Sequence, residues 1–421
     1  MPNSTSVITN QKKGLWSINN VYNGINFGCW NYESVSSGLY GLYVWGHNPH
    51  GEFGDKRTSP ARSHIPILVG AVDCWDINMN PDDMIGYYAI MAKKTDGSVF
   101  AWGLNNYGQL GNGSFTPASS PSQIAGIWRC VSQGVHHAGG VKCDGTLWTW
   151  GHNPHGMLGL NFDGGDRPTP QQVGTNTNWC SVNVDHHQAF AIKTDNTLWA
   201  WGHNPAGQLG TGNVTSQSSP TQIPGSWTCV KGGHRGTFAR RTDGSHHAWG
   251  PNPHGVLGVG NQTTYSSPVG IGGCWCNISK PSNSHWTTVG RGSDGCLYVW
   301  GHNVHGERGD CCASRGDTVS PCVSPHGNNW CWGAAGYNQA WGVKCDGTLW
   351  GWGQNPHSEI DLGSSPRSSP QQIPGTNWRD VAAGHWMIVA RTDGVSQCQL
   401  GICPENYPNV RYPSFGVCCY N

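Results

Sequence analysis

The sequence Trp-Gly-x-Asn, in which x is any residue, occurs seven times in this chain. The copies begin at Trp45, Trp102, Trp150, Trp201, Trp249, Trp300 and Trp352, at intervals of 48 to 57 residues. One structural unit of about 50 residues therefore recurs over most of the chain. Such a unit buries its apolar face only against its neighbours, so the repeat constrains the fold more than any local pattern does.

The third copy contains the strands and turns of one unit. Asp144-Gly145 is typical of two-residue hairpin turns, and residues 146–150 are mostly β-branched and aromatic, which favours a buried strand. Asn153-Pro154 and Gly156 then predict a turn, because Asn and Gly tolerate unusual backbone angles and Pro fixes φ. A second apolar strand precedes each such hairpin turn. A third strand lies further upstream and begins with a Trp, at Trp75, Trp128, Trp179, Trp227, Trp275, Trp330 and Trp378.

Several short strands per unit, joined by tight turns and a Ser/Pro-rich connector, predict an all-β chain, since no segment carries a useful amphipathic helical period. Seven such units favour a β-propeller with seven four-stranded antiparallel blades. Residues 378–394 lack their own Trp-Gly strand, and the first such strand, residues 42–46, lacks its upstream half. We predict that these two halves pair to complete a seventh blade, which removes exposed sheet edges.

The extent of the repeat sets the predicted domain boundaries. We expect the propeller to cover residues 39–394, with an N-terminal arm over 1–38 and a C-terminal extension over 395–421. The arm is too apolar to be a free tail, so we expect it to pack on the propeller or to dock onto a partner. Its aromatic candidates for partner binding are Trp16, Tyr22, Phe27 and Trp30.

The longer consensus Trp-Gly-x-Asn-x-x-Gly-x-Leu-Gly resembles the repeat of the regulator of chromosome condensation family, over roughly residues 39–394. The resemblance implies a seven-bladed propeller, and the regular, weakly charged copies look like the bacterial and phage versions of that family. The copies depart from the consensus at Arg308, Ser358 and Asp361, and residues 79–87 look like an insertion. These departures leave the implied fold intact but weaken the transfer of any particular activity.

The charge balance argues against nucleic acid and anionic membranes as partners. The chain has 24 Lys and Arg against 24 Asp and Glu, and charged residues make up only 11% of it. No apolar run of about 18 residues is present, so we expect no membrane span. The first residues are polar and lack an apolar signal core, which argues against classical secretion of the chain as written.

The chain has 18 Cys, and several of them recur at equivalent positions of the repeat, which favours buried thiols that behave as small hydrophobic side chains. Cys130, Cys180 and Cys331 closely follow the repeat Trp, and Cys345 precedes an Asp-Gly turn. An isolated disulfide is a lesser alternative. A metal site is weaker still, because the sequence contains no Cys-x-x-Cys.

Histidines gather in the loops that follow the Trp-Gly strands. One interpretation is a ring of imidazoles that binds metal or responds to pH. The simpler one is repeated turn chemistry with exposed or hydrogen-bonded His, because no carboxylate or Cys stands at a fixed spacing from them; we therefore predict no bound metal or cofactor. The weak metal candidates are His47, His50, His152, His155, His302 and His305. Asp82-Asp83 in the insertion is interpreted as part of a solvated loop.

The sequence contains no Walker loop, Gly-x-Ser-x-Gly elbow or His-Glu-x-x-His, so we expect no enzyme. The favoured hypothesis is a structural or interaction propeller, and specifically a virion component such as a phage head decoration or tail appendage, assembled in the host cytoplasm. Its partners would be capsid or tail proteins, or a host surface. The first alternative is a cytoplasmic nucleotide-exchange factor for a small GTPase, which is the best-known activity of the family.

A third hypothesis is an inhibitor-type propeller that covers an enzyme with one face. Aromatic loop residues would then be the anchors, because interfaces concentrate their binding energy in such side chains. The candidates are Phe53, Tyr107 and Tyr265. The sequence does not define the oligomeric state, the partner or the binding face.

Overall fold

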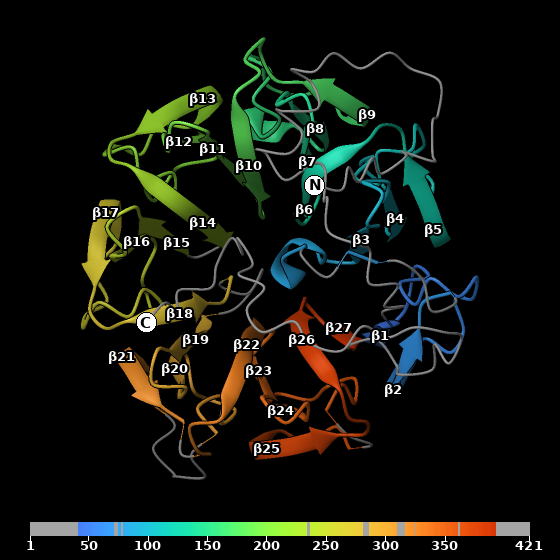
Figure 1. Cartoon of the computed structure of the whole chain (residues 1–421), viewed down its shortest axis with the longest axis vertical. Helices are drawn as coiled ribbons and strands as arrows, with labels where there is room; N and C mark the ends of the chain where they lie inside the picture. Colours follow the sequence, from blue (N-terminus) through green and yellow to red (C-terminus); the bar gives the residue numbers. More distant parts are fainter. Residues whose placement is uncertain are drawn as a thin grey trace, which may run out of the picture. The chain divides into compact units, whose positions relative to one another are not determined.

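Seven antiparallel sheets surround a central axis in the computed structural model of this chain (Figure 1). The structure describes residues 41–70, 75–76, 79–233, 236–280, 286–309, 316–324, 326–360 and 363–392. The prediction of an all-β, seven-bladed propeller is confirmed. All of the predicted arm (1–38) and all of the predicted extension (395–421) lie outside the described residues. The same is true of Trp16, Tyr22, Phe27 and Trp30.

Five blades each use four consecutive strands, ordered from the axis outwards. The second blade contains β6 (Trp128–Gln133), β7 (His137–Lys142), β8 (Leu147–Gly151) and β9 (Arg167–Gln172). The third contains β10 (Trp179–Val184), β11 (Gln188–Lys193), β12 (Leu198–Gly202) and β13 (Gln217–Ile223). The fourth contains β14 (Trp227–Gly233), β15 (Gly236–Arg241), β16 (His246–Gly250) and β17 (Tyr265–Ile271).

The fifth blade contains β18 (Trp275–Ile278), β19 (Thr287–Gly292), β20 (Leu297–Gly301) and β21 (Thr318–Val323). The sixth contains β22 (Trp330–Gly336), β23 (Gln339–Lys344), β24 (Leu349–Gly353) and β25 (Arg367–Ile373). The single-turn helix η2 (Pro154–Gly156) lies in the loop after β8. Within the described residues, no helix is long and apolar enough to cross a membrane.

The closing blade joins the two ends of the repeat region, as predicted. It contains β26 (Trp378–Ala383), β27 (Met387–Thr392), β1 (Gly41–His47) and β2 (Arg62–Leu68), in that order from the axis. β1 pairs antiparallel with β27 over six residues, with Val44 opposite Val389. This pairing satisfies backbone groups that an open ring would expose at two sheet edges.

The first blade departs from the four-stranded pattern. It contains β3 (Ala89–Lys93), β4 (Val99–Gly103) and β5 (Ala118–Ile124), and Trp75 makes only an isolated bridge to Lys94 where an inner strand was predicted. The chain then forms the short helix η1 (Pro81–Asp83), which Figure 1 shows at the centre of the ring. Pro81 has no backbone N–H to donate to a sheet, which favours this helical turn over a continued strand.

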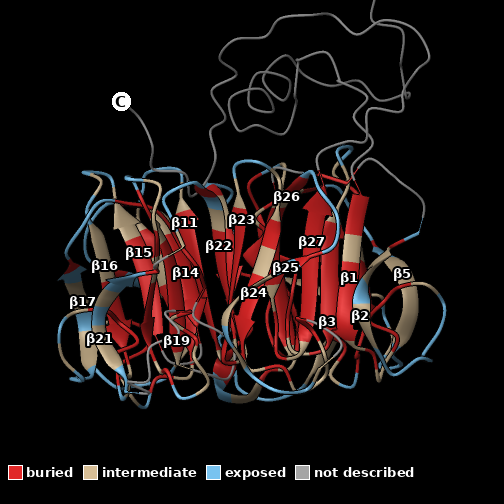
Figure 2. Ribbon diagram, turned by 90° about the horizontal axis from the view of Figure 1, so that it is seen from below, coloured by how far each residue is buried: buried red, intermediate tan, exposed pale blue. Residues whose placement is uncertain are grey.

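Each blade is fastened to the preceding one by the Trp of its Trp-Gly strand. Trp102 donates from Nε1 to the carbonyl of Glu52 at 2.8 Å, and Trp45 closes the ring with the carbonyl of Glu359 at 2.8 Å. The equivalent bond occurs in every blade, from Trp45, Trp102, Trp150, Trp201, Trp249, Trp300 and Trp352. These seven Trp residues are fully buried, in keeping with the concentration of buried residues on the inner strands in Figure 2.

The motif Asn fixes the loop after that strand. The Asn204 Oδ1 accepts the N–H of Leu209 at 2.9 Å, and its Nδ2 donates to the carbonyls of Asn213 and Thr215 at 3.0 Å each. The Oδ1 bond recurs in all seven copies, and each of these Asn side chains is buried. Trp-Gly-x-Asn is therefore a structural element that each blade needs.

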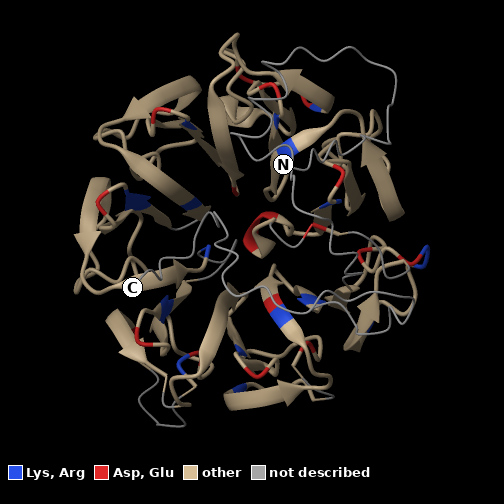
Figure 3. Ribbon diagram, in the orientation of Figure 1, with Lys and Arg blue, Asp and Glu red and all other residues tan. Residues whose placement is uncertain are grey.

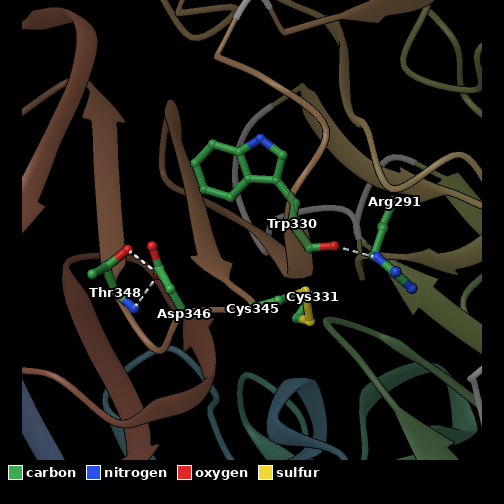
Figure 4. The surroundings of a disulfide bond; sticks show 6 residues. All are labelled: Arg291, Trp330, Cys331, Cys345, Asp346 and Thr348. Atoms are coloured by element: carbon green, nitrogen blue, oxygen red, sulfur yellow. Dashed lines mark hydrogen bonds between the residues drawn. A yellow bond between two sulfur atoms is a disulfide. The ribbon is translucent and has the colours of Figure 1, made fainter.

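The structure contains a disulfide between Cys331 and Cys345, with their Cα atoms 5.0 Å apart (Figure 4). The prediction of buried thiols is wrong for this exposed pair. A register shift in β22 between Trp330 and Trp332 displaces Cys331 from the regular pairing and brings it beside the end of β23. Cys130 and Cys180 are free thiols.

Candidate functional site: a closed channel and an aromatic–histidine belt

The insertion enters the central channel of the propeller. Asn80 caps η1 by accepting the N–H of Asp82, and Pro81 and Asp82 are buried. The acidic residues of this helix lie at the axis of the ring in Figure 3. The interpretation of Asp82-Asp83 as a solvated loop is therefore wrong, because the channel supplies both carboxylates with buried polar partners.

Asp82 pairs with the fourth and fifth blades. Its Oδ2 lies 2.6 Å from the Lys231 Nζ and also accepts the backbone N–H of Lys280 at 3.3 Å. The Lys231 Nζ donates in addition to the Asn277 Oδ1 at 2.8 Å. The Asp82 and Lys231 side chains are each only 5% exposed, so this is a buried ion pair whose partners depend on each other.

Asp83 pairs with the second and third blades. Its Oδ1 accepts the Ser132 hydroxyl at 2.8 Å and the Asn183 Nδ2 at 2.7 Å. Burial raises the pKa of the Asp83 carboxyl to about 6, against the opposing effects of Lys280 and Ser132. Five blades thus meet at the two carboxylates, counting the first blade that carries them. The insertion adds apolar contacts through Met79, Met84 and Ile85, which are buried in the same core cluster as Val131 and Ala382.

Arg391 anchors the start of the insertion. This residue of β27 is buried and donates to both Asp380 oxygens, at 2.9 and 2.7 Å, and to the carbonyls of Asp76 and Met79, at 2.7 Å each. At the equivalent position of the second blade stands the apolar Val141, because β6 pairs Cys130 with Val141 as β26 pairs Asp380 with Arg391. The closing blade therefore carries a buried cation at this position, and this cation holds the insertion.

The insertion ends by placing two tyrosines on one face of the propeller, where they join a set of rings. We call this set the aromatic–histidine belt. Its members come from the insertion, from the loops between the first and second strands of blades, and from the loops after the Trp-Gly strands. They are His47, His50, Tyr87, Tyr88, Tyr107, His136, His152, His155, His186, His187, His203, His254, Trp286, His302, His305, Tyr337, His357, His385 and Trp386.

The belt is densest where the closing and sixth blades meet. Trp386 lies between His385 and His357, with ring centres 4.0 and 4.5 Å away. Tyr87 stacks on His385 at 4.3 Å, and Tyr337 meets the same imidazole edge-on at 4.3 Å. Tyr87, Tyr337 and Trp386 are all partly exposed. This part of the belt is a packed aromatic patch with solvent on one side.

The belt continues over the other blades. Tyr107, in the loop after β4 of the first blade, packs between His152 and His136 of the second, with ring centres 4.0 and 4.8 Å away. Further contacts of this kind are His136–His186, His186–His187, His187–His203, His155–His203, His254–Trp286 and His302–His305, all with ring centres within 6.3 Å. Most of these side chains are partly exposed.

Burial lowers the pKa of several belt imidazoles and so favours their neutral form. Burial lowers the pKa of His136 and of His357 to about 4, helped by neighbouring imidazoles, and it also lowers the pKa of His47, His50 and His203. Deep burial lowers the pKa of His137, which lies beneath the belt, well below its ordinary value. At neutral pH these rings therefore act as uncharged aromatic and hydrogen-bonding groups.

His302 behaves differently from these imidazoles. A hydrogen bond with Glu307 raises its pKa, because the carboxylate favours the charged ring. Two other belt imidazoles pair with carboxylates, His152 with Asp166 at 2.8 Å and His254 with Asp317 at 2.6 Å. Carboxylates therefore accept from belt imidazoles at His152, His254 and His302.

The predicted site residues fall in different places. All six His candidates lie in the belt, but in the described ranges no three His, Cys, Asp or Glu side chains converge as metal ligands would. Tyr107 lies in the belt. Tyr265 is on the outer strand β17 and bonds to Asn261, away from it. Phe53 is fully buried, so its prediction as an exposed anchor is wrong: its N–H is held by Asn48 and its ring enters the core.

Sequence reasoning missed the belt residues that precede the second strand of each blade, such as His385, Trp386 and Tyr337. Their residue types differ from blade to blade, so no motif marks them. Their position does recur, at the end of each strand that begins with the repeat Trp. Their constant separation in sequence from the repeat Trp was the signal that could have identified them.

Glu52 shows how a carboxyl can replace an amide in the repeat. Its Oε2 accepts the His50 N–H at 2.9 Å, and Gln109 and Gln208 accept the corresponding N–H in other copies. Burial raises the pKa of Glu52 to about 8. A carboxyl whose pKa is raised in the folded chain stabilises the fold at low pH, and this contribution is lost as pH rises from about 4.5 through about 8.

We therefore expect Glu52→Gln to raise the free energy of unfolding by about 2 kcal/mol at pH 9 and to change it by less than about 0.5 kcal/mol at pH 5. Urea unfolding followed by circular dichroism at both pH values measures the difference. The matched reverse change, Gln208→Glu, should introduce the same loss at high pH. An effect of Glu52→Gln that is equal at pH 5 and 9 would contradict the assignment.

Two segments of the chain match the family model for the regulator of chromosome condensation (RCC1) repeat, residues 96–139 and 195–240. The chain is 29% identical over 150 residues to the Regulator of chromosome condensation of Xenopus laevis, covering 34% of this chain and 35% of that protein. It is 26% identical over 185 residues to the ultraviolet-B receptor UVR8 of Arabidopsis thaliana, covering 42% and 41%. The matches thus span well under half the length of these relatives.

Solved propellers have the same fold. Prp20p of Saccharomyces cerevisiae aligns with a TM-score of 0.72 at 18% identity, over 86% of this chain and 93% of that one. Human WBSCR16 aligns with a TM-score of 0.69 at 17% identity, over 83% and 99%. These relatives are eukaryotic, and they give no support to the expectation of a bacterial or phage version. The chain is a seven-bladed propeller, two segments of which match the repeat of the regulator of chromosome condensation family.

Proposed function

We propose that the protein is a non-enzymatic interaction propeller that binds a protein partner through the aromatic–histidine belt. The observation that carries this proposal is the series of partly exposed rings on one face, around a channel that the insertion closes. Trp and Tyr side chains supply large contact areas with few rotatable bonds and a polar tip, which is why they dominate binding energy at protein interfaces.

The opposite face is less suited to a partner. The Asp side chains of its hairpin turns accept hydrogen bonds from within the same turn. Asp144 accepts from the N–H and hydroxyl of Thr146, and Asp195 accepts from the N–H and hydroxyl of Thr197. The belt, by contrast, presents partly exposed aromatic rings, among them those of Trp386, Tyr337 and Tyr87. Related propellers support a protein as the partner, since Prp20p is described as binding Gsp1p and histones, and yeast RCC1 as bound to Kap60.

Photo-crosslinking tests the binding face. A photoreactive residue is placed at Pro205 or Val304, both exposed in loops on the belt face, and at Asn176, exposed in the connection from β9 to β10 on the opposite face. We expect one protein to crosslink from positions 205 and 304 at least tenfold more than from 176, because the anchors of an interface cluster in one patch. Equal or stronger crosslinking from 176 would overturn the proposal.

Nucleotide exchange on a small GTPase is the second candidate, because relatives named Regulator of chromosome condensation match part of the chain. That role would use the insertion as a wedge against the partner. Asp82 is buried in the channel and bonded to Lys231, which argues against a projecting wedge. We expect the rate of fluorescent-nucleotide release from a small GTPase to stay unchanged when the chain is added. An acceleration of about tenfold or more would favour this candidate instead.

A virion location is a separate proposal about where the partner is found. The regular copies and the low charge suggested a head decoration or tail appendage, whereas the relatives named above are eukaryotic. Mass spectrometry of purified particles decides between a virion and a cytoplasmic location. The chain in stoichiometric amount with capsid or tail proteins would support the virion, and its restriction to soluble cell extract would exclude it.

A further inference from the structure

Imidazoles of the belt pack directly against one another. His47 and His357 are stacked, with ring centres 4.4 Å apart and planes inclined by only 14°. His155 and His203 are 4.3 Å apart, and His186 and His187 are 3.9 Å apart. Two neutral imidazoles pack well at these distances, whereas two imidazolium ions repel each other.

The surroundings of the His47–His357 pair offer little to compensate a second positive charge. His50 and Arg62 both add positive potential at His47, and Arg62 does so at His357. The His47 Nδ1 contacts the Tyr88 hydroxyl at 3.2 Å, and Trp386 covers His357. None of these neighbours carries a negative charge at neutral or acidic pH.

The two nearby carboxyls do not supply a counter-charge in acid. Burial raises the pKa of Glu52 to about 8 and that of Glu359 to about 7, so both become neutral before the imidazoles gain protons. Each is also committed to the backbone, through the N–H of His50 and of His357 respectively. Acidification therefore adds positive charge to this part of the belt with no acid to offset it.

We propose that the belt is an acid-sensitive binding surface. It holds its protein partner at neutral pH and releases the partner when the stacked imidazoles become protonated and repel each other. This inference rests on the proposed function. Because burial lowers the pKa of both His47 and His357, their contribution to stability is present above about pH 6.5 and is lost as pH falls, for His357 through about pH 4. The stacked pair then separates, and with it the aromatic surface around Trp386.

The first test needs no partner. The fluorescence of Trp386 is obtained as the difference between the full chain and its Trp386→Phe variant, titrated from pH 8 to 4 with far-UV circular dichroism alongside. We expect about a twofold loss with a midpoint below pH 6, since charged imidazoles quench adjacent indoles. The loss should be reduced at least by half in His47→Gln/His357→Tyr, which leaves His385 beside Trp386 and uses residues found at the equivalent Gln354 and Tyr107, and should persist in full in the control His64→Gln on β2.

A Trp386 signal that is flat between pH 8 and 4, or whose loss coincides with global unfolding, would overturn the inference while leaving the binding face to be decided by crosslinking. The second test washes the crosslink-validated complex of the full chain at pH 7.5 and pH 5. We expect at least tenfold less partner retained at pH 5, and a pH 5 to pH 7.5 retention ratio near one for the double His variant. Equal pH sensitivity of both proteins would also overturn it.

Discussion

Replacing Lys231 by Met is expected to destabilise the propeller by about 3–5 kcal/mol, the largest effect of any single change considered for this chain. Met fills nearly the same volume but leaves Asp82 in the channel without its ammonium partner, where the two side chains are each 5% exposed. The Asn277 Oδ1 loses its donor at the same time. Equilibrium unfolding in urea, followed by circular dichroism, measures the loss.

The double variant Asp82→Asn/Lys231→Met separates the ion pair from packing. It removes both charges, so most of the stability lost in Lys231→Met should return. Lys193→Met is the matched control, because Lys193 lies over the rings of Trp179 and Trp199 in cation–π contacts and its replacement should cost no more than about 1 kcal/mol. A single Lys231→Met change that costs no more than Lys193→Met would show that the insertion does not depend on this pair.

Replacing the motif residue Asn204 by Ala is expected to cost about 2–4 kcal/mol. The change removes four side-chain hydrogen bonds and leaves the Leu209 N–H and the carbonyls of Asn213 and Thr215 without their partner, in a loop that also carries the next inter-blade contact. Buried polar groups left unpaired account for most of this loss. Urea unfolding again provides the measurement.

The control for this change is Asn176→Ala, since Asn176 is exposed in a connecting loop and should alter stability by no more than about 0.5 kcal/mol. If Asn204→Ala proved as mild as the control, the motif Asn would not be the structural fastening described above. Selection for a function would then have to explain why Asn occupies this position in all seven copies.

The fold could be predicted from the sequence because its stabilising contacts recur at a fixed spacing. The Trp that bonds to the preceding blade and the Asn that holds the loop appear once per repeat, so the pattern identified the blades and the pairing of residues 42–46 with 378–394. The single exception, the missing inner strand of the first blade, coincides with the insertion, where the repeat itself is interrupted.

The channel contacts could not be predicted in the same way. Asp82 meets Lys231 and Lys280, which are 149 and 198 residues away in the chain, and neither lysine belongs to a repeated motif. An acidic pair in an insertion has the composition of a solvated loop, and only the closure of the ring brings the lysines to it. The sequence identified the belt histidines of the motif loops, because they recur with the repeat. It did not identify Trp286, Tyr337 and Trp386, because their loops share no residue type.

The proposed binding face also explains why the insertion matters for function. Its buried end closes the channel through Asp82 and Asp83, and its exposed end contributes Tyr87 to the belt. A change that releases the buried end should therefore disturb the aromatic patch at the centre of the face. Lys231→Met should therefore weaken partner binding as well as stability, although Lys231 itself lies within the channel and not in the belt.

Oxidative footprinting of the tryptophans, with the partner bound and absent, tests the central claim most directly. Trp286 and Trp386 are partly exposed in the belt, whereas Trp148 and Trp199 are partly exposed beside the turns of the opposite face and serve as internal controls. We expect the partner to slow oxidation of Trp286 and Trp386 by about fivefold or more and to leave Trp148 and Trp199 unchanged, because the core of an interface excludes water. Protection of Trp148 and Trp199 alone would place the partner on the other face and contradict the account.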